Sequence, residues 1–324
     1  MGSTHARALA SLGRGEHIRY IVARTGGGIV EAAPSATVVT DFEVALKDPT
    51  IDVVSICTPT GTHRELAVRA LRAGKNVLLE KPIALTMPDS IAIYDEATRS
   101  GKTFMIAQVV RFFRGYRQLR HDVADGKLGR MLSARASRIG AKPDWAEWLR
   151  DYAEAGGMLV DFGIHDFDQV NLFLGDPVEV SATAASSLGP VETTITYREG
   201  GIGHVHSFAD LRAGVPFRSS LEVVGTEGFA RYEYAAETPK LGASDAAPFR
   251  RVSHYSLSAS AHESELELGI DEPYAQQLEY FLNCVAQGVE PGYCSTPSAL
   301  LALEVALAAT RSVELGVPVR LNSN

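Results

Sequence analysis

The sequence predicts an α/β protein of two domains: a Rossmann-type, doubly wound sheet followed by an α+β domain with a mostly antiparallel, open sheet. The chain has 324 residues, which is more than one ordinary domain needs. Strand and helix patterns alternate over residues 2–107, which is typical of βαβ units. Further along, strands follow one another across short turns with Gly or Pro, which indicates antiparallel pairing. We therefore expect one domain over residues 1–112 and a second over 113–324.

The first domain is predicted from apolar runs and from the residues that end them. Residues 52–57 (DVVSIC) form a continuous apolar run, of the kind buried on both faces of a parallel sheet. A helical pattern over 63–74 stops at Gly74. The expected elements are helix 2–13, strand 17–23, strand 37–39, helix 41–48, strand 52–57, helix 63–74, strand 76–80, helix 90–101 and strand 103–107.

The second domain has a different pattern. Several strands fall between residues 178 and 234, and the stretch 235–265, rich in Ala, Ser and charge, is predicted to form loops. The remaining expected elements are helix 114–125, strand 131–137, helix 156–174 and two amphipathic helices at 272–287 and 297–315.

Composition excludes several classes of protein. The net charge of −8 argues against a binder of nucleic acid or anionic membranes, because the chain has no excess of cations to neutralise phosphates. No apolar run reaches the length of a membrane span. Cys57, Cys284 and Cys294 show no spacing suited to a disulfide framework or a thiolate zinc site, so we expect a reducing compartment, the cytoplasm.

Lys81 is the first candidate for chemistry. It lies in Glu80-Lys81-Pro82, directly after a predicted parallel strand, and ligands bind at the carboxyl ends of such strands. An ammonium there can hydrogen-bond a substrate hydroxyl and favour its alkoxide character. The alternative is a solvated lysine at a strand end, the commoner fate of this residue type.

Asp161, His165 and Asp168 form the second candidate group. Their spacing places them on one face of a helix. Histidine suits general acid–base chemistry, because its pKa lies near neutral pH. A simple pair on the helix surface and a divalent metal site, as in a metal-dependent lyase or isomerase, are the alternatives. We expect Asp168 to be structural.

For other polar and aromatic residues, the sequence pattern does not single out a functional role. Arg111, Trp145 and Trp148 could line a pocket for a polyol, or they could serve as an ion pair and hydrophobic anchors. His204 and His206 alternate onto one face of a strand, where a sheet surface or a subunit interface is the better interpretation than a metal site.

Taken together, several segments resemble the Gfo/Idh/MocA oxidoreductases, a family that includes glucose-fructose oxidoreductase and inositol dehydrogenase. The resemblance covers nearly the whole chain and rests on MGSTHARAL (1–9), DVVSICTPTGTH (52–63), ALRAGKNVLLEKPIAL (70–85), GGMLVDFGIHDFD (156–168) and VVGTEG (223–228). The pairing of LLEKP with GGxLxDxGxHxxD is its most specific part.

The resemblance implies an NAD(P)-dependent dehydrogenase of a sugar or cyclitol, assembled as a homodimer or homotetramer through the open sheet. His165 would be the acid–base, with Asp161 as its partner at the substrate and Lys81 beside the nicotinamide. The substrate contacts would come from Lys81, Asp161 and His165, with Arg111 and Trp148. The turn Thr58, Pro59, Thr60 and His63 would run under the nicotinamide ribose, next to Glu80, Lys81 and Pro82. Many members carry Asn where Thr60 stands.

The cofactor end of the first domain departs from the family pattern. Members usually begin with a strand and a GxGxxG turn, whereas here Gly2 would be the third glycine of that turn. We expect a misplaced start or a fragment, and the alternative is a non-catalytic sugar-binding or assembly protein that has lost its dinucleotide site. Where NAD-selective folds carry an acidic residue after the second strand, this chain has Arg24, which suits a 2′-phosphate, so we favour NADP over NAD.

Overall fold

The chain forms two compact units in the computed structural model. The first comprises Met1–Phe112 with Glu272–Leu300, and the second Phe113–Asp271 with Leu301–Asn324. The sequence pattern places residues 272–300 in the second domain, whereas they pack with the first unit. The structure describes residues 1–23, 32–141, 155–186, 189–212, 215–237, 250–259, 262–268 and 271–321.

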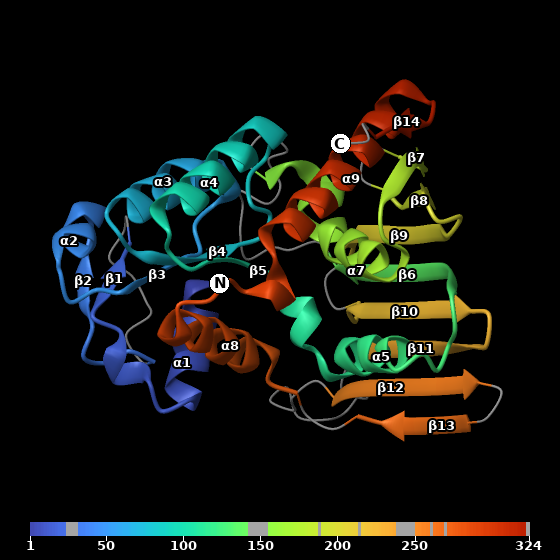
Figure 1. Cartoon of the computed structure of the whole chain (residues 1–324), viewed down its shortest axis with the longest axis horizontal. Coiled ribbons are helices and arrows are strands. Elements are labelled where there is room, and N and C mark those ends of the chain that lie inside the picture. Colours follow the sequence, from blue (N-terminus) through green and yellow to red (C-terminus); the bar gives the residue numbers. More distant parts are fainter. Residues whose placement is uncertain are drawn as a thin grey trace. The chain divides into compact units, whose positions relative to one another are not determined.

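Parallel strands form the centre of the first unit (Figure 1). Two of them pair with each other, and three more form a second sheet in the order β3-β4-β5. This arrangement confirms the Rossmann-type class. The strands are β1 (Tyr20–Val22), β2 (Thr37–Val39), β3 (Val53–Ile56), β4 (Asn76–Glu80) and β5 (Phe104–Ala107).

The helices of the first unit begin and end where the sequence favours it. The hydroxyl of Thr86 accepts the N–H of Asp89 at the start of α4, and Gly101 ends that helix with a φ of 61°. The helical elements are α1 (Gly2–Ser11), η1 (Gly15–His17), α2 (Phe42–Lys47), η2 (Thr60–Thr62), α3 (His63–Arg72), α4 (Met87–Ser100), η3 (Val109–Phe112), α8 (Pro273–Gln287) and η6 (Gly292–Cys294).

Helix α8 explains why residues 272–300 join the first unit. Its apolar side chains Leu278 and Phe281 pack into one core cluster with Leu78 of β4 and Met105 of β5. Burial of such side chains contributes about 1.5–3 kcal/mol each. Helical periodicity reveals the apolar face of a helix but not the surface on which it packs. The packing of residues 272–300 with the first unit could therefore not be predicted from the sequence.

The second unit contains a nine-stranded sheet in the order β13-β12-β11-β10-β6-β9-β8-β7-β14. Neighbouring strands are antiparallel except β6 and β9, which run parallel, so the expectation of a mostly antiparallel sheet is confirmed. Its strands are β6 (Met131–Ala141), β7 (Pro177–Ala184), β8 (Val191–Tyr197), β9 (Ile202–Leu211), β10 (Arg218–Gly225), β11 (Gly228–Glu237), β12 (Arg250–Ala259), β13 (His262–Glu267) and β14 (Val319–Arg320).

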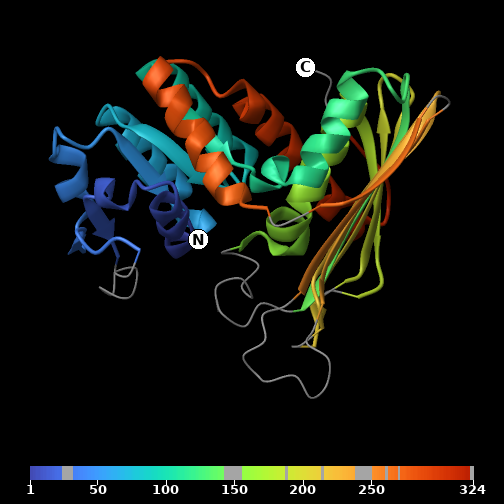
Figure 2. The same cartoon turned by 90° about the horizontal axis from the view of Figure 1, so that it is seen from below.

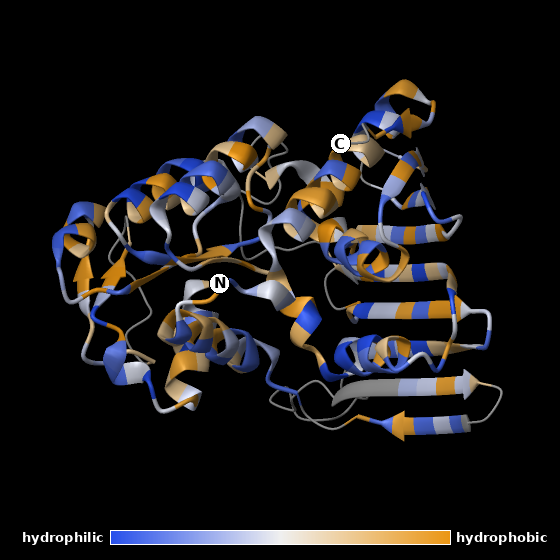
Figure 3. Cartoon of the chain, viewed as in Figure 1, coloured by the Kyte–Doolittle hydropathy of each residue, from blue (hydrophilic) through white to orange (hydrophobic). Residues whose placement is uncertain are grey.

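One face of this sheet carries helices α5 (Arg114–Ala124) and α7 (Ile164–Leu174), and Figure 2 shows both on the same side of the strands. Polar and apolar residues alternate along the strands (Figure 3). In β10, Leu221 and Val223 are fully buried while Glu222 between them is partly exposed. The last helix, α9 (Thr296–Leu315), runs from the first unit into the second.

The expectation of loops over residues 235–265 is wrong for the part of that stretch that the structure describes, and residues 238–249 and 260–261 lie outside it. Strands β12 and β13 occupy much of this stretch, and β11 reaches into it. Tyr255 and Leu257 are 1% and 3% exposed, so the inward positions are apolar as a strand requires. The serines and alanines between them give a composition typical of loops, which hides the alternation.

Among the described residues, no helix combines the length and the apolar character needed to cross a membrane.

Candidate active site

The carboxyl ends of β3, β4 and β5 lie along one edge of their sheet. The parallel register pairs Ile56 with Leu79, and Glu80 with Ala107. The turn after β3, which contains Thr58 and Pro59, therefore emerges beside the Lys81 turn after β4. In open parallel sheets this edge is where ligands bind.

The Lys81 turn is anchored by the residue before it. Glu80 is 5% exposed, and its Oε2 accepts the backbone N–H of Lys81 at 3.2 Å. Lys81 itself is half-buried, Pro82 is buried, and the peptide bond between them is cis. The lysine side chain thus projects from a turn whose backbone is held by a buried carboxylate.

His63 links the two turns. Its ring is 1% exposed, with Nδ1 2.9 Å from the carbonyl oxygen of Pro82 and Nε2 3.0 Å from that of Thr58. Burial lowers the pKa of His63, although both carbonyl oxygens favour its charged form. A neutral imidazole donates one N–H, so one of the two carbonyls receives it at a time. The ring holds backbone here, and its direct contact with a cofactor stays a prediction.

The threonines of the turn after β3 bond to one another. The hydroxyls of Thr58 and Thr62 lie 2.7 Å apart, and Thr62 donates to the carbonyl oxygen of Pro59 at 2.7 Å. Thr62 occupies the N-cap position of α3 without a side-chain capping bond, and Thr60 is buried. The hydroxyl of Thr62 thus closes its own turn and does not cap the helix.

His5 also belongs to this site, although the sequence analysis does not single it out. Its Nε2 lies 3.0 Å from Oε1 of Glu80 and its Nδ1 lies 2.8 Å from the hydroxyl of Ser55. Cys57 Sγ is 3.5 Å from the same Nδ1. The signal that could have revealed it is a histidine among the small apolar residues of the first helix.

The start of α1 has the chemistry that a dinucleotide needs. The helix begins at Gly2, and no side chain caps it. Uncapped N–H groups at a helix start, together with the helix dipole, favour a pyrophosphate. Beside the strand-end turns, these donors fit a dinucleotide. Of the other predicted contacts, Arg24, Trp145 and Trp148 lie outside the described residues.

Arg111 forms hydrogen bonds within the first unit. It is 1% exposed, and its guanidinium donates to the carbonyl oxygen of Tyr293 at 2.6 Å and to the hydroxyl of Ser298 at 2.8 Å. These bonds tie η3 to the segment that follows α8. A guanidinium has five N–H donors, so these two bonds leave open a further contact with a polyol, and that role of Arg111 stays a prediction.

Asp161 and His165 lie at the junction of two helix types. Asp161 falls in a π-helical turn, η5 (Leu159–Gly163), which leads into α7. The expected single helix over 156–174 is therefore wrong at its start. Gly156 and Gly157 have φ values of 78° and 80°, which explains why two glycines precede this turn. Both candidate side chains are half-buried. Single π-helical turns are rare and are frequent at functional sites.

Helix α7 is fixed by a buried ion pair that the sequence analysis missed. Arg138 of β6 donates to both carboxylate oxygens of Asp166, at 2.8 and 2.9 Å, and Asp166 is fully buried. The guanidinium also lies over the rings of Phe162 and Phe217, at 5.7 and 5.6 Å. Arg138 occupies the same face of its strand as two buried alanines, and a charge on an apolar face was the available signal.

Asp168 is 3% exposed and accepts a hydrogen bond from the amide of Gln169 at 3.0 Å. Its burial agrees with the structural role we expect.

The two histidines of β9 lie on the surface of the sheet. His206 lies 2.6 Å from Glu192, and His204 lies 3.4 Å from the hydroxyl of Thr194.

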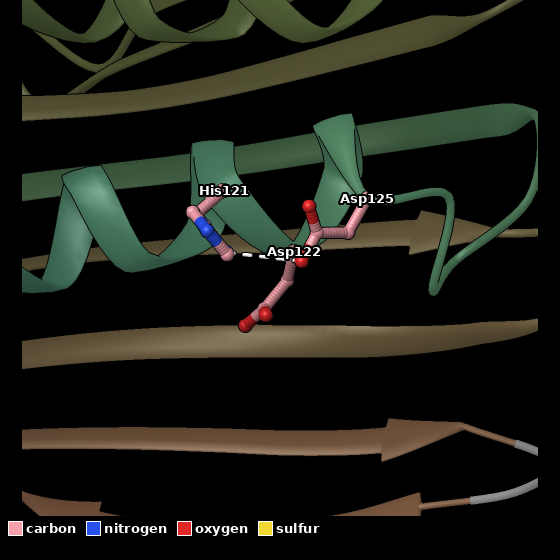
Figure 4. A group of neighbouring side chains, drawn as sticks. All are labelled: His121, Asp122 and Asp125. Atoms are coloured by element: carbon pink, nitrogen blue, oxygen red, sulfur yellow. Dashed lines mark ion pairs between the residues drawn. The ribbon is translucent and has the colours of Figure 1, made fainter.

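Three further residues carry ligand atoms close together, namely His121, Asp122 and Asp125 near the end of α5 (Figure 4). Lys127 Nζ lies 2.5 Å from Asp122 and 3.5 Å from Asp125, so one lysine cation already pairs with both carboxylates. Tyr255 also donates to Asp122. We interpret the cluster as a helix-end ion-pair network.

Comparison with known proteins assigns the chain to a family. Residues 1–108 match the model of an oxidoreductase family with an NAD-binding Rossmann fold, and residues 116–231 match the Gfo/Idh/MocA C-terminal domain. The chain is a Gfo/Idh/MocA oxidoreductase, a member of a family of NAD-binding enzymes.

Individual relatives agree with this assignment. The chain is 28% identical to scyllo-inositol 2-dehydrogenase (NAD(+)) of Bacillus subtilis, over 87% of this chain and 80% of that protein. It is 35% identical to D-glucoside 3-dehydrogenase of Escherichia coli, over 49% of this chain and 46% of that one. Among solved structures, GenD2 from gentamicin A biosynthesis in complex with NAD superposes with a TM-score of 0.81, at 26% identity, over 100% of this chain and 94% of GenD2.

Proposed function

We propose that the protein transfers a hydride between a nicotinamide cofactor and a secondary alcohol of a sugar or cyclitol, with Lys81, Asp161 and His165 as its catalytic residues. The observation that carries the proposal is the Lys81 turn. An amine at the carboxyl end of a parallel strand is held there by a buried carboxylate and, through Pro82, by the imidazole of His63. This construction suits a group that must meet a ligand in one fixed position.

Each residue has a separate task. When bound, the nicotinamide supplies the hydride acceptor or donor. The ammonium of Lys81 hydrogen-bonds the substrate hydroxyl and stabilises its oxygen as negative charge develops. His165 takes the hydroxyl proton, and returns it in the reverse direction. Asp161 binds the neighbouring hydroxyl of the substrate or orients the imidazole.

The substrate class follows from the relatives. Their names specify an inositol and a glucoside, which share a ring of adjacent secondary alcohols. A carboxylate, an imidazole and an ammonium can each bond a hydroxyl of such a ring. We therefore propose a polyol ring rather than an open-chain aldehyde.

The choice between the two nicotinamide cofactors rests on Arg24. We propose NADP, because a guanidinium can pair with the 2′-phosphate but cannot accept hydrogen bonds from ribose hydroxyls. Fluorescence titration with NADPH and NADH tests this choice. Tighter binding of NADH would overturn it.

The face of the nine-stranded sheet opposite α5 and α7 is the proposed contact between subunits, in a homodimer or homotetramer. Light scattering during size-exclusion chromatography tests this, and a monomer at micromolar concentration would contradict it. Three free cysteines agree with the proposed cytoplasmic location, a reducing compartment.

The experiment that tests the function measures NAD(P)H formation with a panel of cyclitols and hexoses. Lys81→Ala and His165→Ala should each lower kcat by about 10²–10⁴-fold, the usual contribution of acid–base groups. Lys102→Ala and His121→Ala alter exposed residues of the same types and should leave kcat unchanged. Wild-type turnover in either test variant would refute its role, and failure to bind any nicotinamide cofactor would favour the non-catalytic alternative.

A further inference from the structure

The inference concerns the buried contact between the first helix and the Lys81 turn. His5 is 2% exposed and touches residues of two strands. Its Nε2 lies 3.0 Å from Oε1 of Glu80, and its Nδ1 lies 2.8 Å from the hydroxyl of Ser55 at the neighbouring strand. Glu80 uses its other oxygen, Oε2, to accept the N–H of Lys81. One carboxylate therefore bridges His5 to the backbone of Lys81.

This bridge has a clear electrostatic reason. Glu80 is 5% exposed, and a buried carboxylate without a cation costs several kcal/mol. His5 can supply that cation, because an imidazolium donates from both nitrogens and both nitrogens here have an acceptor in reach. Burial disfavours the charged ring, but the hydrogen bonds to Cys57 and Glu80 outweigh it and raise the pKa of His5 to about 10.

Among the described residues, groups from three parts of the chain face the ring. Glu80 is the last residue of β4. Ser55 belongs to β3, and Cys57 directly follows that strand. The ring centre of Tyr274, in α8, lies 6.3 Å from that of His5. Of these, only Glu80 is a carboxylate. The charge of His5 is thus favoured by Cys57 and by Glu80, the residue that precedes the proposed catalytic lysine.

We propose that His5 is a positioning residue of the reaction: it holds the Glu80 carboxylate and thereby fixes the turn from which Lys81 reaches the substrate. The proposal rests on the proposed function of Lys81. It makes the first helix a part of the catalytic machinery, besides any contact that Gly2 makes with a cofactor. His63 holds the same turn from its other side, at the carbonyl of Pro82.

The test is a double-mutant cycle on turnover in the full chain, with His5→Gln, Glu80→Gln and the double variant. If His5 acts through Glu80, each single change lowers kcat by about 10- to 100-fold, the effect of a small misplacement of a reacting group. The double variant then loses little more than the worse single one, because both changes break one bridge. The dissociation constant for NADPH or NADH should change much less than kcat. His17→Gln alters an exposed histidine of the same unit and serves as the control.

Several results would overturn the proposal. They are an unchanged kcat in folded His5→Gln, losses that multiply in the double variant, or a loss confined to cofactor affinity. If His5→Gln does not fold, as judged by circular dichroism, Glu80→Gln alone decides, since it keeps the size of the side chain and should lower kcat by the same factor.

Lys81→Ala, measured in parallel, separates the two levels of inference. If Lys81→Ala is inactive and His5→Gln is fully active, positioning by His5 fails and the proposed function stands. If Lys81→Ala is fully active, the role of the lysine fails, and with it the reason to hold its turn.

A second readout does not depend on turnover. Competitive acetylation with mass spectrometry reports how accessible Lys81 is, relative to exposed Lys102 at the start of the turn before β5. A loosened turn should raise the labelling of Lys81 relative to Lys102 by about twofold or more in His5→Gln, and no change would count against the proposal.

Discussion

The guanidinium of Arg138 donates to both carboxylate oxygens of Asp166, the residue directly after His165. Arg138 belongs to β6 and Asp166 to α7, so this pair fixes the helix that carries the proposed base against the sheet. The charge of Asp166 keeps the pKa of Arg138 above its usual value even though burial acts against the charged form. Arg138 and Asp166 are 28 residues apart in sequence, so the position of His165 depends on a contact between distant parts of the chain.

Loss of this pair should destabilise the second unit. Arg138→Ala leaves a buried carboxylate without its partner, which costs about 3–5 kcal/mol. Unfolding in guanidinium chloride, followed by fluorescence, measures the loss. Arg135→Ala is the matched control, because Arg135 lies on the opposite, exposed face of the same strand and should change stability by less than about 0.5 kcal/mol. Equal effects of the two changes would contradict a structural role for the pair.

The charged state of His5 predicts a pH dependence of stability. Its pKa rises from 6.5 to about 10 on folding, so its stabilising contribution is complete below pH 6.5 and disappears as the pH rises towards 10. The difference in unfolding free energy between wild type and His5→Gln should therefore be largest at about pH 6 and clearly smaller at about pH 9. Chemical unfolding at both values measures it. A difference that stays constant, or that grows with pH, would show that His5 is neutral in the folded protein.

Close packing of α5 on β11 predicts a cost for a single methyl group. A Cβ on Gly115 would overlap the ring of Tyr232, which itself packs edge-on against Tyr116 at 5.0 Å. Gly115→Ala should destabilise the protein by about 1–3 kcal/mol, as overpacking does. Gly292→Ala adds the same group where no atom lies within 4 Å and provides the comparison. A neutral result at Gly115, measured by thermal unfolding, would contradict the packing described here.

The fold class could be predicted from the sequence because its signals are local. The apolar runs of β3 and β4, with the helix between them, form one continuous stretch of sequence, and this pattern predicts a parallel βαβ unit. Strands β12 and β13 escaped prediction, because their outward positions carry Ser and Glu, residues that loops also favour. The π-helical turn at Asp161 escaped as well, since its extra residue per turn leaves no mark on an apolar pattern.

The candidate site divides in the same way. Lys81 and the Asp161–His165 pair stand in short motifs and could be named from the sequence alone. His5 and Arg138 could not, because their partners Glu80 and Asp166 are 75 and 28 residues away, and only tertiary packing brings them into contact. The proposed catalytic residues are thus visible in the sequence, whereas the contacts proposed to hold them in place are visible only in the structure.

The central claim is that Lys81 and His165 act on the same hydroxyl of a polyol. Single-turnover hydride transfer, measured for Lys81→Ala, His165→Ala and the double variant with the best cyclitol or sugar substrate, tests it most directly. If the two groups stabilise one transition state together, the double variant should be at most about tenfold slower than the slower single variant. Losses that multiply in full would show that the two residues act independently, and wild-type rates in either single variant would refute the shared role.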